Sequence, residues 1–442
     1  MPKLPRAELR RIERAHKIAN TLIVGIDPAS RRHTAVIYSP TQQPLTNALE
    51  VPNDRAGFER FEKVLNGHRA TFPSRPVVFA IEASGEHWKP LAQYFGERGH
   101  EAVYVPPLFV KRTRDVDDYT PRANDPKDTV RIANLARDGR YFVRQTQPEV
   151  FEDLNHLIRS WEQVSKQLAQ VRLRLRALQE KYFPEYFSAF ANLLGAASLA
   201  ILSRWPFPDD MLAADKSEMM AALGVASRNK LGAAKLGKLQ SLAATSVGLK
   251  SGRRGARCRL QHLVGQAQFF SKQAAHIIRQ LRGLLEEIDY AKRLDSLPGV
   301  GFISTARLLG HLGDLANFDK VDQVIDFAGL SLIASDSGTF RSSRHISRRG
   351  RKALRRILYE ITCRFVRFAN TARRKFLRCR LQGKLYRQAI VAAIVHLLRT
   401  IFAVVKGNQA YRHPSVDDPL RDELAELEAR WLVRQQELKK AA

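Results

Sequence analysis

The sequence predicts a protein of three parts: an α/β N-terminal domain, a pair of long antiparallel coiled-coil helices, and a mainly α-helical C-terminal domain. Two observations predict these parts, and a third indicates the kind of partner. Apolar runs typical of strands alternate with helical patterns over roughly residues 20–145, and two heptad-spaced stretches of equal length follow. The third is charge: 73 Lys and Arg against 44 Asp and Glu give the 442-residue chain a net charge of +29. Such an excess indicates a polyanionic partner, most often a nucleic acid.

The composition also argues against several classes of protein. The cysteines, Cys258, Cys363 and Cys379, lie far apart without a C-x-x-C pair, so neither a disulfide framework nor a cysteine-based zinc site is expected, and a reducing cytoplasm fits. Residues 1–19 are too charged for a signal peptide and predict a short basic N-terminal arm. The most apolar stretch, 389–398, has about half of the ~20 residues needed to cross a bilayer, and predicts a buried helix rather than a membrane span.

The α/β domain is expected over residues 20–148. Its apolar runs LIVGID, TAVIY, PVVFAIE and HEAVYVP are separated by turn and helix patterns. Two of the runs end in an acid, Asp27 and Glu82, and side chains at strand ends can project into the cleft where α/β domains bind ligands. Asp125 and Asp128 are three residues apart at the start of a predicted helix, so both fall on one face of it.

These four acids are candidates for a metal site. Converging carboxylates repel one another unless divalent cations hold them together. Mg²⁺ favours oxygen ligands, and two such ions can stabilise the attacking and leaving oxygens of a phosphoryl transfer. The alternative is four separate solvent-facing acids, with Asp125 capping a helix beside Pro126. Asp27 is the most persuasive, because an acid following LIVGI is costly if it is merely buried.

Heptad spacing predicts one long helix at residues 149–183 and another at 256–290, with 184–255 inserted between them. The seam positions are Leu154, Leu157, Trp161, Val164, Leu168, Val171, Leu175, Leu178 and Tyr182 in the first helix, and Leu260, Leu263, Ala267, Phe270, Ala274, Ile277, Leu281, Leu284 and Ile288 in the second. Each seam should extend about 42 Å. Equal length favours antiparallel pairing with the insertion at the tip. Pairing between subunits, or packing of two amphipathic helices in an ordinary core, remains open.

The C-terminal domain is expected over residues 291–410, with a charged helical tail at 411–442. Its LPGVG sequence places Gly299 and Gly301 in a tight turn, which resembles a helix-hairpin-helix element that grips the DNA backbone; a plain helix connector is the alternative. Residues 341–380 contain 15 Arg or Lys and one acid. The candidate phosphate-binding residues, predicted to lie largely on one helix with Arg356, are Arg348, Arg349, Arg351, Lys352 and Arg355.

These motifs together resemble a known family. VGIDPASRRHTAVI, FAIEASGEHW and NDPKDTVRIANLARDG resemble the D, E, D and D elements of the RuvC-like (RNase H-like) domain of the DEDD insertion-sequence transposases, the insertion sequence one-ten and eleven-eleven type. LPGVGFISTARLLGHLGDLANF, FAGLSLIASDSGTFRSSRHISRRGRKALRRILYE and GKLYRQAIVAAIVHLL resemble its C-terminal transposase domain. The resemblance spans residues 20–145 and 290–405, and the family also has heptad helices between these domains.

The resemblance implies a metal-dependent DNA transposase. Asp27, Glu82, Asp125 and Asp128 would bind Mg²⁺ (or Mn²⁺), and Ser337, in the DSGTF segment, would be the nucleophile that attacks DNA. Partners would be donor and target DNA, a structured non-coding guide RNA that leaves sequence choice to base pairing, and further copies of the chain in a homodimer or homotetramer. The place of action would be the bacterial cytoplasm or nucleoid.

Two departures from the family pattern leave assignments open. The second acid pair stands in NDPKDT rather than in a KTDxxDA-like setting, so the nearby acids Asp115, Asp117 and Asp118 are alternatives. Without the family, Ser337 would be interpreted as a loop serine capping a turn. Its neighbours Ser335, Ser342, Ser343 and Ser347 are alternative nucleophiles.

Two other functions remain open beside the transposase. One is a RuvC-like structure-selective endonuclease that hydrolyses DNA with the four acids alone. The other is a non-catalytic scaffold whose fold presents positive charge to a nucleic acid. A catalytic role of Ser337 would distinguish a transposase from the endonuclease. A catalytic role of Asp27 would distinguish a transposase from the scaffold.

Overall fold

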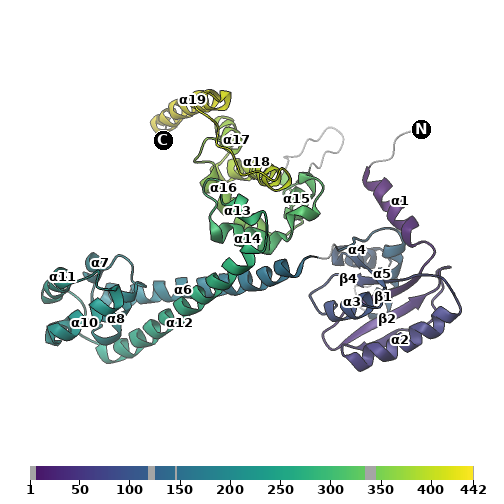
Figure 1. Cartoon of the computed structure of the whole chain (residues 1–442), viewed down its shortest axis with the longest axis horizontal. Coiled ribbons are helices and arrows are strands. Elements are labelled where there is room, and N and C mark those ends of the chain that lie inside the picture. Colours follow the sequence, from purple (N-terminus) through teal and green to yellow (C-terminus); the bar gives the residue numbers. More distant parts are fainter. Residues whose placement is uncertain (1–5, 118–124, 145–146, 334–344, 442) are drawn as a thin grey trace. The chain divides into compact units, whose positions relative to one another are not determined.

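The computed structural model describes residues 6–117, 125–144, 147–333 and 345–441. The chain forms two compact units, Met1–Thr146 and Gln147–Ala442 (Figure 1). The division falls close to the expected end of the α/β domain at residue 148. Each unit is described by itself.

Among the described residues, the first unit contains a mixed five-stranded sheet in the order β3-β2-β1-β4-β5. The strands are β1 (Leu22–Asp27), β2 (Arg32–Tyr38), β3 (Leu49–Pro52), β4 (Val77–Glu82) and β5 (Glu101–Val105); the helices are α1 (Arg6–Ile18), α2 (Arg55–Ala70), α3 (Lys89–Gly96), α4 (Pro107–Asp117) and α5 (Asp125–Arg137). β1, β4 and β5 run parallel, whereas β2 pairs antiparallel with β1 and β3. The predicted α/β character of this region is confirmed.

Helices cover both faces of this sheet (Figure 1). On one face, Phe58 and Phe61 of α2 and Phe95 of α3 pack against alternate strand residues such as Val24 and Phe79. On the other face, residues of α1, α4 and α5 pack against the intervening strand positions: Ile18, Val110, Ile132, Ala133 and Ala136 meet Ile23, Val36, Val78, Ala80 and Val103. Because strand side chains alternate between faces, the register decides which functional side chains meet α4 and α5.

The predicted basic N-terminal arm is a helix that belongs to the first unit. Arg14 Nη1 of α1 donates to the Tyr141 carbonyl oxygen at 2.6 Å, and Ile18 is buried in the α5 side of the core. Gly139 has a φ of +71°, and a Cβ on it would lie 2.0 Å from the Arg11 carbonyl oxygen. Position 139, two residues after the end of α5, must therefore be glycine for α1 to dock.

Two long helices, α6 (Glu149–Tyr182) and α12 (Arg253–Glu286), lie side by side in the second unit (Figure 1). Val171 and Leu175, late in α6, share a core with Leu260 and Leu263, early in α12. At the other end, Leu154 and Ile158 share a core with Ile277 and Leu281. The helices therefore run antiparallel within one chain, as their matched length predicts.

A small helical subdomain joins the two long helices at one end. Its elements are α7 (Tyr186–Ala189), α8 (Ala196–Arg204), α9 (Pro208–Ala213), α10 (Lys216–Ser227) and α11 (Ala233–Ala244). Their buried residues, among them Tyr186, Leu202, Met211, Met219 and Leu239, form one core with α6 and α12. The insertion is thus a folded cap on the helix pair.

The remaining helices form the C-terminal part of the second unit. They are α13 (Ala291–Leu294), α14 (Phe302–Leu312), α15 (Val321–Ala328), α16 (Lys352–Phe365), α17 (Thr371–Leu381), α18 (Tyr386–Lys406) and α19 (Pro419–Ala441), with a 3₁₀ turn η1 (Leu315–Asn317) and the short strands β6 (Leu332–Ile333) and β7 (His345–Ile346). Helix α18 is the one described helix long and apolar enough to cross a membrane. Its apolar residues Ile390, Ile394, Leu397 and Ile401 are buried among α14, α15 and α16, as in the core helix of a folded domain.

The tightest helix-to-strand contact in the first unit generates a testable prediction. A Cβ on Gly25 of β1 would lie 2.4 Å from the Thr129 carbonyl oxygen of α5. We expect Gly25→Ala to push α5 off the sheet at a cost of about 1–3 kcal/mol, seen as faster amide hydrogen exchange in peptides from β1 and α5. Gly67→Ala is the control, because a Cβ on Gly67 of α2 meets nothing within 4 Å; it should leave exchange unchanged or slow it. Equal exchange rates in the two variants would contradict this packing.

Candidate active site

Asp27 and Glu82 lie on neighbouring parallel strands at the same edge of the sheet. The last register pair between β1 and β4 is Ile26 with Ile81, and each acid is the next residue on its strand. Ile26 and Ile81 belong to the core on the α2 side. Because side chains alternate along a strand, Asp27 and Glu82 share the opposite face, which α4 and α5 cover. Both residues are half-buried.

Asp128 reaches this face from α5. The close approach of α5 to β1 occurs at Thr129, whose carbonyl oxygen fills the space where a Gly25 side chain would stand. Gly25 is two residues before Asp27 and Thr129 is next to Asp128, so this contact carries Asp128 to the strand ends. Asp128 is 3% exposed. Three of the four predicted acids thus gather on one face of the sheet.

Two arginines that the sequence analysis did not identify hold the Asp128 carboxylate. Arg131, one turn further along α5, donates from Nη1 to Asp128 Oδ1 at 2.8 Å and is itself 6% exposed. Arg114 of α4 donates from Nε to Oδ1 at 3.3 Å and from Nη2 to Oδ2. Asp128 and Arg131 are three residues apart, a spacing that predicts an ion pair on one face of a helix. Nothing in the spacing of Arg114 and Asp128 predicts their contact.

The surroundings of Glu82 disfavour its charged form. Burial raises the pKa of the Glu82 carboxyl, the nearby Asp128 carboxylate raises it further, and Arg114 partly offsets both. Within the described residues, no group of three His, Cys, Asp or Glu side chains is close enough together to hold a metal ion as it stands. The oxygen donors that Mg²⁺ prefers are present, but Asp128 is occupied by arginines.

The remaining predicted site residues are only partly described. Asp125 begins α5, and Asp115 and Asp117 lie in α4, but their side chains fall outside the described residues, as does Asp118. Ser337 and its neighbours Ser335, Ser342 and Ser343 also lie outside them, whereas Ser347 is described just after β7.

The chain on either side of the Ser337 segment is held together. β6 and β7 pair antiparallel, with Leu332 opposite Ile346 and Ile333 opposite His345. Just below them, Arg348 N donates to the Gly329 carbonyl oxygen at 3.0 Å, and a Cβ on Gly350 would lie 2.5 Å from Gly329 N. Ile333 and His345, the described residues on either side of this segment, are therefore neighbours.

The basic segment differs from its prediction in one respect. Helix α16 begins at Lys352, so Arg348, Arg349 and Arg351 precede it instead of lying on its turns. Arg348 has a φ of +54°, which breaks the helical run, and Gly350 packs against Gly329. Arg348, Arg349 and Lys352 are exposed on this turn.

Two of the predicted phosphate-binding arginines also support the fold. Arg351 Nη1 donates to the His311 carbonyl oxygen at 2.7 Å, with its guanidinium over the Phe327 ring. Arg355 Nη1 donates to the carbonyl oxygens of Ala328 and Gly350, each at 3.0 Å. These two side chains fix the basic turn against α14 and α15.

The two glycines of the LPGVG turn differ in their surroundings. Gly299 has a φ of +77°, and a Cβ on it would lie 2.9 Å from the Arg364 Cβ of α16. Gly301 is exposed at the N-cap of α14, and a Cβ on it would meet nothing within 4 Å. The first glycine is thus required for packing, whereas the second leaves the N-terminus of α14 accessible.

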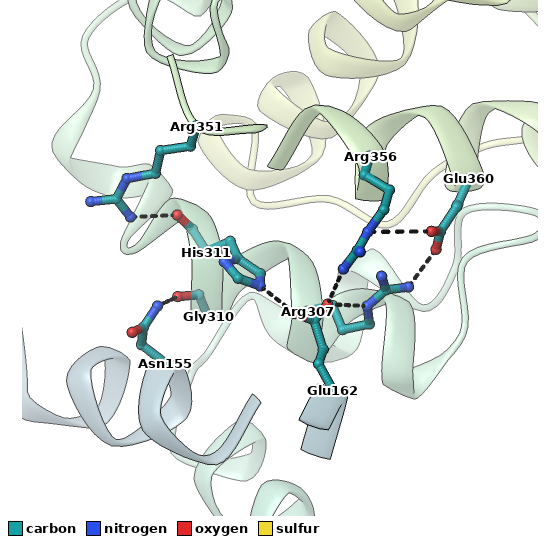
Figure 2. Close-up of polar contacts among 8 residues, drawn as sticks. All are labelled: Asn155, Glu162, Arg307, Gly310, His311, Arg351, Arg356 and Glu360. Atoms are coloured by element: carbon teal, nitrogen blue, oxygen red, sulfur yellow. Dashed lines mark hydrogen bonds and ion pairs between the residues drawn. The ribbon is translucent and has the colours of Figure 1, made fainter. Parts of the chain in front are cut away.

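A polar cluster ties α6 to α14 and α16 (Figure 2). Glu162 of α6 accepts from Arg307 Nε at 3.0 Å and Arg356 Nη2 at 3.1 Å, and lies 3.3 Å from His311 Nε2. Glu360 receives a second contact from Arg307 at 2.5 Å. Burial and the neighbouring arginines lower the pKa of His311, whereas Glu162 raises it in part.

Comparisons with known proteins match two separate regions of this chain. Residues 24–184 match a transposase family of the DEDD IS110 type, and residues 291–378 match the transposase IS116/IS110/IS902 family. The Streptomyces clavuligerus insertion element IS116 uncharacterized 44.8 kDa protein is 22% identical over 88% of this chain and 95% of its own length. The Streptomyces coelicolor insertion element IS110 uncharacterized 43.6 kDa protein is 23% identical over 71% of this chain and 78% of its own. The Moraxella lacunata pilin gene-inverting protein is 31% identical over 31% of this chain and 44% of its own.

The lowered pKa of His311 predicts a pH-dependent stability of the second unit. Since the folded pKa lies below 6.5, the unfolded chain binds the proton first on acidification. Stability should therefore fall as the pH drops below about 6.5, with a slope of at most about 1.4 kcal/mol per pH unit from this group. His311→Gln should flatten this slope in urea unfolding followed at several pH values. His156→Gln, at an exposed position of α6, should keep it. A slope retained in His311→Gln would show that another group is responsible.

Proposed function

The chain belongs to the IS110 family of transposases, and we propose that it cuts and rejoins DNA with the acids of the first unit as metal ligands and Ser337 as the nucleophile. It is a DNA transposase, and its DEDD-type domain implies the use of a divalent metal. The observation that carries the proposal is the shared face of Asp27, Glu82 and Asp128 beneath α5. The five-stranded order and the two helical layers fit a RuvC-like domain.

Asp27, Glu82, Asp128 and Asp125 would hold Mg²⁺ or Mn²⁺. The donor set fits such an ion, because every ligand is a carboxylate oxygen and Glu82 is half-buried with a raised pKa, as expected for an anion short of positive charge. A bound ion supplies Lewis-acid stabilisation of the phosphate oxygens. Arg114, whose side chain is 25% exposed, would compete with such an ion for the Asp128 carboxylate.

Ser337 Oγ would attack the DNA phosphorus. The new Ser–O–P bond replaces one P–O bond of the strand, the serine proton passes to solvent, and the departing oxygen takes up a proton as a free hydroxyl end. A hydroxyl end of another strand then attacks the phosphoserine link and restores the serine. Because each step exchanges one phosphodiester for another, rejoining needs no external energy source. The pairing of β6 with β7 holds the two flanks of the Ser337 segment next to each other.

The basic turn and the α14 N-terminus would bind nucleic-acid phosphates. Arg348, Arg349 and Lys352 are exposed, and Gly301 leaves the N–H groups at the start of α14 open, as in a helix-hairpin-helix element. Donor and target DNA are the substrates, with a structured non-coding RNA as guide. The chain would act as a homodimer or homotetramer in which the long helices form a coiled coil. Its place of action would be the bacterial cytoplasm or nucleoid.

Ser337→Ala tests the serine nucleophile against a nuclease that uses the acids alone. We expect covalent protein–DNA adducts to disappear and strand exchange to fall by at least about 10⁴-fold, because no other group supplies the nucleophile. The measurement is denaturing gel analysis of adducts and recombinant products with purified protein, DNA and Mg²⁺. Ser347→Ala, at the first position after β7, is the control and should form adducts normally. Undiminished cleavage by Ser337→Ala would favour the structure-selective endonuclease. Loss of all strand exchange in Asp27→Ala, with DNA and RNA affinity unchanged, would eliminate the non-catalytic scaffold.

A further inference from the structure

Helix α17 carries a dense group of positive charges. Its sequence, TARRKFLRCRL, contains five basic residues and no acid: Arg373, Arg374, Lys375, Arg378 and Arg380. A helix of this composition is normally exposed to solvent or to a polyanion.

The C-terminal helix α19 covers most of these charges. Arg373 Nε donates to Glu428 Oε1 at 2.6 Å, and Arg374 Nη1 donates to Glu423 Oε2 at 3.1 Å. Arg378 forms a second ion pair with Glu423. The arginines of α17 thus meet acids at the positions where they would otherwise meet phosphates, since the guanidinium fork binds carboxylate and phosphate in the same way.

The apolar contact beneath these ion pairs is small. Leu377 of α17 packs against Leu424 and Leu427 of α19, with Trp431 at the border. The Arg380 guanidinium lies 4.6 Å from the centre of the Trp431 ring. Further along α19, Leu432, Val433 and Leu438 are more than half exposed. The cover is therefore held by this apolar contact, to which Phe376, Leu381 and Leu420 also contribute, and by part-exposed ion pairs. Such ion pairs contribute little individually and weaken with salt.

The surroundings of α17 remain positive with the cover in place. Burial lowers the pKa of His396 on α18, and the charges of Arg399, Lys375 and Arg374 lower it further. Glu423 and Glu428 therefore do not neutralise the positive charge around α17. The matched transposase region ends at residue 378, so α19 lies outside both family matches.

We propose that α17 is a DNA-backbone-binding surface that α19 covers, with Glu423 and Glu428 bound to the arginines in place of phosphates. Release of α19 would free Arg373, Arg374 and Arg378 for three phosphate contacts. The occupant is duplex DNA, because DNA is the substrate of the family to which the chain belongs. This inference rests on the DNA binding in the proposed function, but not on the metal site or on Ser337.

The test compares two variants of the full-length chain with equal changes in net charge. Glu423→Gln with Glu428→Gln removes the two acids that bind α17. Glu426→Gln with Glu437→Gln is the matched control, because Glu426 pairs within α19 with Arg430 and Glu437 is exposed. Binding to a blunt DNA duplex of arbitrary sequence is followed by fluorescence anisotropy without divalent ions.

We expect the Glu423/Glu428 variant to bind more tightly than the control, with a salt slope steeper by about 2.7 for three added contacts. Its advantage over the control should accordingly shrink by about 40-fold between about 50 and 200 mM salt. Deletion of residues 419–442 should give at least the same gain; if that truncated chain does not fold, the double glutamine variant decides alone.

Affinity and salt slope equal to those of the control would overturn the proposal, as would a gain confined to single-stranded RNA. Neither result would bear on the metal ligands or on the serine nucleophile, because no strand is cut in this experiment. Conversely, normal strand exchange by Ser337→Ala would contradict the serine nucleophile and leave the proposal for the α17 surface unaffected.

Discussion

The close contact between β1 and α5 is the constraint on which the candidate site depends. At Gly25 the strand has no side chain, and the Thr129 carbonyl oxygen occupies that space. This lets α5 lie low enough on the sheet for Asp128 to reach the face that Asp27 and Glu82 share. Any larger residue at position 25 would separate the helix acid from the strand acids. The arrangement of the candidate site is therefore set by a backbone contact two residues before Asp27.

Charge balance then governs what this face can bind. A carboxylate as buried as Asp128 is stable only when paired, and Arg131 and Arg114 provide that pairing. Arg131 is buried with Asp128 in the same helix, whereas Arg114 reaches it from α4 and is more exposed. Burial and the neighbouring Asp128 carboxylate raise the pKa of the Glu82 carboxyl, and Arg114 offsets this only in part. A divalent ion would supply the missing charge. Arg114 is the side chain that has to give way for Asp128 to join as a ligand.

Local patterns predicted the parts of the molecule that local forces determine. Strand-like runs ending at Asp27 and Glu82, and heptads of equal length, gave the sheet acids and the antiparallel helix pair, because alternation and helical period are properties of neighbouring residues. Contacts between distant segments were not predictable this way. The Arg114–Asp128 pair joins two helices, and the cover of α17 by Glu423 and Glu428 depends on how the chain returns after α18. The start of α16 at Lys352 was missed because the packing of Gly350 on Gly329 sets it.

The central claim is that the acids of the first unit form one divalent-metal site. Titration of Mn²⁺ into the full-length chain, with free Mn²⁺ followed by electron paramagnetic resonance, tests it most directly and needs no DNA. Asp27→Asn and Glu82→Gln should each weaken binding by at least about tenfold, as expected for loss of a ligand. Glu97→Gln, exposed at the end of α3 on the opposite face of the sheet, should bind as the wild type does. Wild-type Mn²⁺ affinity in both Asp27→Asn and Glu82→Gln would contradict the claim.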